Sequence, residues 1–167
     1  MSDTIETINN QINDTDINAD DNVQQYLTFM MEEEEYGVDI LSVQEIRGWE
    51  EVTVIPNAPA FVKGVINLRG TIVPLIDLRA RFSLATKPYT ALTVVVVIKV
   101  EFELDNKIMG IVVDAVSDVY SIDDASISQA PSSGDNANHR YIKGLVNVEG
   151  QMVSLLNLTK LLNLEIS

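Results

Sequence analysis

The stretch KGVINLRGTIVPLIDL, residues 63–78, has a near copy later in the chain, KGLVNVEGQMVSLLNL at residues 143–158. The two segments align without a gap and share the lysine, both glycines, the asparagine, the valine and both leucines. Apolar, largely β-branched runs on either side of a glycine turn predict a β-hairpin in each copy, with Gly70 supplying the positive φ that the first turn requires. Similarity of this kind indicates an internal duplication.

The repeat extends upstream, where residues 37–46 align with residues 110–119. Each copy opens with a strand-like run, at residues 24–32 in the first and 92–101 in the second. The sequence therefore predicts a mainly β chain made of two five-stranded units. We expect them to form two small antiparallel barrels packed side by side, because closure removes the exposed edges of a short sheet.

The boundaries of these units follow from the same alignment. We expect the first barrel at about residues 23–88 and the second at about residues 89–156. A helical turn over residues 157–164 is expected to pack at their junction. A short helix is also expected within residues 41–46, and the Ser- and Asn-rich residues 129–139 are typical of an inserted loop.

The amino-terminal segment, residues 1–22, differs in amino-acid composition from the rest of the chain. It is rich in Asn, Asp, Thr and Gln, and only the isolated Ile5, Ile8, Ile12 and Ile17 suggest a helical stripe. This composition predicts a disordered acidic tail.

The formal charge of −14 is concentrated at the amino terminus. Twelve acidic residues precede Arg47, the first basic residue, and the remaining 13 acids are nearly balanced by 11 bases. Nucleic acids and anionic lipids bind clustered basic faces, which this chain lacks, so neither is an expected partner. The longest apolar stretch, residues 91–98, is about half of the roughly 20 residues that a membrane span needs. We expect a cytoplasmic protein with no membrane insertion, which the absence of cysteine also fits.

The sequence contains no recognisable set of catalytic residues. His139 is the only histidine and there is no cysteine, so a thiolate nucleophile, a cysteine zinc site and a multi-histidine metal site are excluded. The acidic run at residues 32–35 is typical of a solvated hairpin turn. We therefore expect no enzyme activity, no metal and no cofactor. The alternative function is a small-molecule-binding β-barrel module, which would require a deep apolar pocket where the two copies meet.

Several motifs resemble those of the CheW family, the coupling proteins of bacterial chemotaxis, over about residues 25–164. The strongest stretches are EYGVDIL at 35–41, VQEIRG at 43–48, PAFVKGVINLRG at 59–70, VPLIDLR at 73–79, GIVVD at 110–114 and VSDV at 116–119. The resemblance implies two SH3-like barrel subdomains without catalysis. It also implies an adaptor that couples the cytoplasmic tip of methyl-accepting chemoreceptors to the regulatory domain of the histidine kinase CheA, with ring-like self-association in arrays.

Site residues are carried over from the same resemblance. The residues that match a groove for the receptor helix tip are Val43, Glu45, Ile46, Arg69, Gly110 and Val119. The kinase contact is expected near Ser128 and Ser133, where other members can carry a basic and an aromatic residue.

One pair of residues is predicted to meet in space. Arg69 aligns with Glu149 across the repeat, and Glu45 aligns with Asp118, so only the first copy has opposite charges at these two places. The fold does not require an arginine in this turn, which suggests a role specific to the first copy. The resemblance implies that Glu45 and Arg69 form an ion pair beside the receptor groove.

Overall fold

The computed structural model describes residues 2–13, 22–50, 52–82, 84–85, 87–101, 105–129 and 141–162. Strands dominate these residues, which confirms the mainly β prediction. The elements in chain order are α1 (Ser2–Asn13), β1 (Val23–Met31), β2 (Glu34–Asp39), η1 (Ile40–Ser42), β3 (Val43–Gly48), β4 (Val62–Leu68), β5 (Thr71–Asp77), α2 (Leu78–Arg81), β6 (Val94–Glu101), β7 (Asn106–Val113), β8 (Ala115–Asp123), η2 (Asp124–Ser126), β9 (Ile142–Val148), β10 (Gln151–Leu156) and α3 (Leu158–Leu162).

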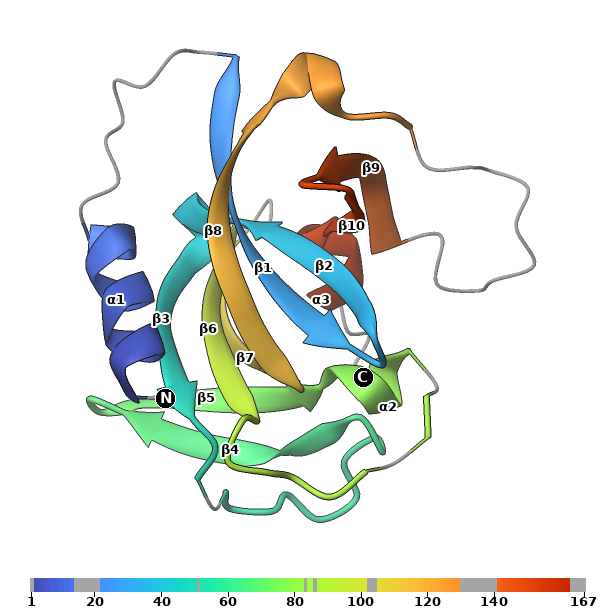
Figure 1. Cartoon of the computed structure of the whole chain (residues 1–167). Helices are drawn as coiled ribbons and strands as arrows, with labels where there is room; N and C mark the ends of the chain where they lie inside the picture. The colour runs from blue at the N-terminus through green and yellow to red at the C-terminus, as the bar shows by residue number, and fades with distance from the viewer. Residues whose placement is uncertain are drawn as a thin grey trace.

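The strands form two five-stranded sheets, with the orders β8-β1-β2-β10-β9 and β3-β6-β7-β5-β4 (Figure 1). The two orders are the same when each strand is replaced by its counterpart in the other copy, as duplication predicts. The sheets do not, however, divide near residue 88. Each sheet takes the opening hairpin of one copy and the remaining three strands of the other, through the parallel pairs β2–β10 and β5–β7.

The core has three parts that follow from this exchange. The largest cluster includes residues of both sheets and of α2 and α3, so it joins the two halves of the molecule. A smaller cluster lies on the other face of each sheet. In β6, Val94, Val96 and Ile98 belong to the shared cluster while Val95 and Val97 belong to the smaller one. Burial of both faces explains why this strand reads as an unbroken apolar run.

The prediction of a short helix within residues 41–46 is wrong. A single 3-10 turn ends at Ser42, and Val43 begins strand β3. The register of β3 against β6 shifts between Val43 and Glu45, which marks a β-bulge at Gln44. The extra residue places two buried side chains, Val43 and Ile46, three positions apart, and this spacing imitates a helical period.

The amino terminus also differs from its prediction, because Ser2–Asn13 forms α1 instead of a disordered tail. Ile8 is only 3% exposed and belongs to the shared core, and Ile5 and Ile12 pack against that core. The spacing of these three residues puts them on one face of a helix. The isoleucine residues therefore do form the apolar face of a helix. Docking of this helix on β3 stabilises a segment whose composition favours disorder. Ile17 lies outside the described residues.

Candidate functional site

The predicted pair of Glu45 and Arg69 is confirmed. Arg69 Nη1 donates to Glu45 Oε1 at 3.0 Å, across 24 positions of sequence. Arg69 lies in the β4–β5 turn and its side chain is 78% exposed, whereas that of Glu45, on β3, is 20% exposed. The pair therefore joins β3 to the β4–β5 turn and presents a guanidinium group to solvent.

The turn holds Arg69 in a defined direction. Arg69 and Gly70 have φ values of 50° and 89°, which is the paired positive φ of a type I′ hairpin turn. The Asn67 side chain accepts a hydrogen bond from the Gly70 amide at 2.8 Å. The second copy repeats this geometry, with φ values of 51° and 85° at Glu149 and Gly150. The backbone is thus equivalent in both copies, and only the charge differs.

An open depression of about 400 Å³ borders the ion pair and is lined by Asn9, Gln44, Glu45 and Arg69. Its lining is polar and charged. A small-molecule-binding module would need a deep apolar pocket, so this depression does not favour the alternative function.

The other residues assigned to the receptor groove lie deeper. Val43 and Ile46 are 4% and 2% exposed, and both belong to the shared core. Gly110 is buried in β7, where an added Cβ would lie 2.5 Å from Leu75 Cδ2. Val119 is half-buried and packs against the shared core. The structure therefore exposes the Glu45–Arg69 pair and places Val43, Ile46 and Gly110 beneath the surface.

Of the two residues assigned to kinase contact, one can be placed. Ser128 is exposed and follows η2. Its backbone N–H and C=O each make a 2.8 Å hydrogen bond to Leu145 of β9, forming an isolated bridge. Ser133 lies outside the described residues.

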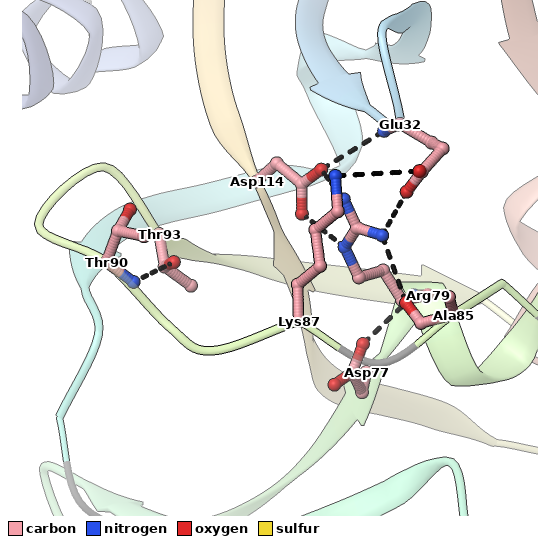
Figure 2. Close-up of polar contacts among 8 residues, drawn as sticks. All are labelled: Glu32, Asp77, Arg79, Ala85, Lys87, Thr90, Thr93 and Asp114. Carbon is pink, nitrogen blue, oxygen red and sulfur yellow. Dashed lines mark hydrogen bonds and ion pairs between the residues drawn. The ribbon is translucent and has the colours of Figure 1, made fainter.

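A second charged cluster was missed by the sequence analysis (Figure 2). Arg79, on α2, has a side chain that is only 8% exposed. It pairs with Glu32 of the β1–β2 turn, and its Nε donates to Asp114 Oδ1 at 2.8 Å. Arg79 also donates to the Ala85 carbonyl, and Lys87 Nζ lies 3.6 Å from Glu32 Oε1. Because Glu32 connects strands of one sheet and Arg79 follows β5 of the other, the cluster ties the two sheets together.

Glu32 lies in the β1–β2 turn as the sequence indicates and is 38% exposed, but it is ion-paired with Arg79. The interpretation of residues 32–35 as a solvated turn is wrong for Glu35, which is only 9% exposed in β2. The signal that could have found the cluster is a charge difference between the copies. Arg79 aligns with Thr159, and Asp114 aligns with Leu41, so neither charge is required by the repeated fold.

The cluster lowers the pKa of both carboxyl groups. For Glu32 the main cause is the hydrogen bond from Arg79, which outweighs the effect of burial. For Asp114, burial alone would raise the pKa. The hydrogen bonds from Arg79 and from the Glu32 amide, together with the charges of Arg79 and Lys87, outweigh this effect, so the pKa is lowered. Both groups are thus held ionised by contacts that exist only in the folded chain.

These lowered pKa values predict a loss of stability in acid. A carboxyl group whose pKa is lower in the folded state stabilises the fold above its ordinary pKa, and this contribution is lost as the pH falls through the folded value. We expect urea unfolding to show stability falling as the pH drops below the ordinary pKa values, 4.5 for Glu32 and 3.8 for Asp114. The stability difference between the wild type and Arg79→Leu should narrow over the same range. A difference that stays constant down to pH 2.5 would contradict this assignment.

Within the described residues, no group of three or more His, Asp or Glu side chains is placed to hold a metal ion. None of the described helices is both long enough and apolar enough to span a lipid bilayer.

Comparison with known proteins identifies the family. Residues 25–165 match the family model of the CheW-like domain. The chain belongs to the CheW family. This finding confirms the resemblance of the motif residues, and with it an adaptor role in chemotaxis.

The match to individual CheW proteins covers most of the chain. Chemotaxis protein CheW of Klebsiella aerogenes is 45% identical over 142 residues, which are 85% of this chain and 83% of that protein. Chemotaxis protein CheW of Treponema pallidum is 34% identical over 141 residues, 82% of this chain and 81% of that protein. The crystal structure of scaffolding protein TtCheW from Thermoanaerobacter tengcongensis has a TM-score of 0.75 at 30% identity, covering 86% of this chain and 95% of that one.

Proposed function

We propose that this chain bridges the cytoplasmic tip of methyl-accepting chemoreceptors to the regulatory domain of the histidine kinase CheA, without catalysing a reaction. The main observation that supports this proposal is the Glu45–Arg69 ion pair. It lies at the surface in a defined geometry, and only one copy of the repeat has it. Membership of the CheW family supports the same role. In this proposal the protein is cytoplasmic and is recruited to receptor arrays by its partners, and neighbouring copies make contacts within the array.

The receptor-binding surface in this proposal is centred on Arg69. Glu45 orients the guanidinium group, and the buried Val43, Ile46 and Gly110 fix the strands beneath it. Val119 lies on β8, in the other sheet, and contributes to the same core. The kinase-binding surface is assigned to the segment that contains Ser128 and Ser133.

Reversing the charge of Arg69 tests the receptor assignment. We expect Arg69→Glu to remain folded with a nearly unchanged melting temperature, because an exposed ion pair contributes only about 0 to 1 kcal/mol. Affinity for a receptor cytoplasmic fragment should fall on the order of tenfold or more, since the surface that the partner contacts would carry two like charges. Isothermal titration calorimetry with purified fragment measures both the affinity and the stoichiometry.

The second copy of the repeat provides a matched control. Glu149→Arg makes the opposite charge change in a turn with the same backbone geometry, and it should leave receptor affinity unchanged. Normal receptor binding by folded Arg69→Glu would overturn the assigned surface. Absence of binding by the wild type to both the receptor fragment and the CheA regulatory domain, at tens of micromolar protein, would overturn the proposed function itself.

A further inference from the structure

Helix α1 lies along the outer edge of β3 (Figure 1). β3 is the first strand in its sheet, so one of its edges pairs with β6 and the other is open. At Ile46, the Asn9 side chain satisfies the backbone groups on that open edge. Its Oδ1 accepts from the Ile46 amide at 2.9 Å, and its Nδ2 donates to the Ile46 carbonyl at 3.2 Å. One side-chain amide thus takes the place of a neighbouring strand.

The apolar contact of α1 is narrow. Ile8 is buried in the shared core, whereas Ile5 and Ile12 are half-buried, and most of the other side chains of residues 5–12 are exposed. A helix of 12 residues is marginally stable by itself in water. Among the described side chains, the buried contact of α1 is the isoleucine stripe, and another amphipathic helix can make contacts of the same kind.

The position of α1 is next to the exposed ion pair. Asn9 lines the same depression as Gln44, Glu45 and Arg69. A partner that contacts Arg69 and continues along β3 therefore meets α1. The edge of β3 is thus occupied by an amphipathic helix, with an isoleucine stripe against the core and an amide directed at Ile46.

We propose that α1 is an intramolecular competitor of the receptor helix, which must displace α1 from the edge of β3 to bind fully. The inference rests on the proposed function and adds a regulatory role for the amino-terminal segment. The apparent affinity for the receptor is reduced by the fraction of molecules in which α1 is docked. Loosening α1 therefore raises that affinity.

The test uses the full-length chain and a receptor cytoplasmic fragment. Asn9→Ala removes the amide pair with Ile46, and Ile8→Asp removes the buried contact. Asn10→Ala is the matched control, because Asn10 is adjacent on the helix and exposed. Amide hydrogen exchange within α1 reports whether the helix is docked in each protein, since Asn9→Ala removes the acceptor of the Ile46 amide directly, and circular dichroism confirms that the sheets remain folded.

We expect Asn9→Ala and Ile8→Asp to speed amide exchange within α1 and to lower the receptor Kd about three- to tenfold. Asn10→Ala should change neither quantity. If the α1 amides exchange faster while the Kd is unchanged or higher, the inference is overturned and the proposed function stands. If neither the wild type nor any variant binds the fragment, the proposed function fails, and this inference fails with it.

Discussion

Replacing Arg79 by leucine is expected to lower the free energy of unfolding by roughly 2 to 4 kcal/mol at neutral pH. The side chain is 8% exposed, and its loss leaves Glu32 and Asp114 without their main counter-ion. Breaking a buried pair costs about 3 to 5 kcal/mol, and an exposed pair about 0 to 1. An intermediate value is expected because Glu32 and Asp114 are 38% and 34% exposed.

Urea unfolding at neutral pH measures this effect, with two further variants as controls. Arg47→Ala removes an ion pair with Glu50 in which both side chains are partly exposed, and it should cost less than about 1 kcal/mol. Arg79→Lys keeps the charge but cannot reach both carboxylates and the Ala85 carbonyl together, so it should fall between the wild type and Arg79→Leu. A loss for Arg79→Leu no larger than that for Arg47→Ala would show that the cluster does not hold the sheets together.

The repeat predicts the local structure of each hairpin well, because a shared residue has the same physical role in both copies. Asn67 and Asn147 each accept a hydrogen bond from the glycine three positions later, at 2.8 and 3.0 Å. The bulge in β3 also has its counterpart in β8, where the register against β1 shifts between Thr28 and Phe29. The asparagine contact depends on a few neighbouring residues, so a sequence comparison can find it. The bulge is also repeated, but its spacing of buried residues was misinterpreted as a helix.

The exchange of hairpins between the two sheets could not be predicted in the same way. A duplicated sequence gives each opening hairpin two equivalent sets of strands to join, one in its own copy and one in the other. The parallel pairs β2–β10 and β5–β7 select the other copy. The choice depends on packing of the whole chain, including the shared core, and no single motif encodes it.

The candidate site shows both the use and the limit of comparing the two copies. A charge difference at aligned positions correctly indicated the Glu45–Arg69 pair, and the same test applied to Arg79 and Asp114 would have indicated the second cluster. The comparison could not address α1, because the segment before β1 was not part of the alignment. Its polar composition predicts disorder, and only tertiary contact with β3 reveals the helix.

Gly64 of β4 is repeated in the second copy as Gly144. Gly64 has a φ of 152° and lies in β4 beside the bridge between Thr53 and Val65. Thr53 and Val65 exchange two backbone hydrogen bonds at 3.0 and 2.9 Å, which join the segment after β3 to β4. An added Cβ at Gly64 would lie 2.3 Å from the Thr53 carbonyl oxygen. That oxygen belongs to the backbone, so it cannot move away without disrupting the bridge.

We therefore expect Gly64→Ala to lower the free energy of unfolding by about 3 to 5 kcal/mol, from backbone strain and overpacking together. Gly70→Ala is the control, since φ there is 89° but no atom lies within 4 Å of the added Cβ, and its cost should be only about 1 to 2 kcal/mol. Gly144→Ala should be intermediate, because its closest contact, at 2.5 Å, is the Ile127 side chain, although the Ser128 carbonyl oxygen lies at 3.0 Å. Chemical denaturation of the three variants gives the order directly. Equal losses for Gly64→Ala and Gly70→Ala would mean that positive φ, and not the close approach of Thr53, is what requires glycine in β4.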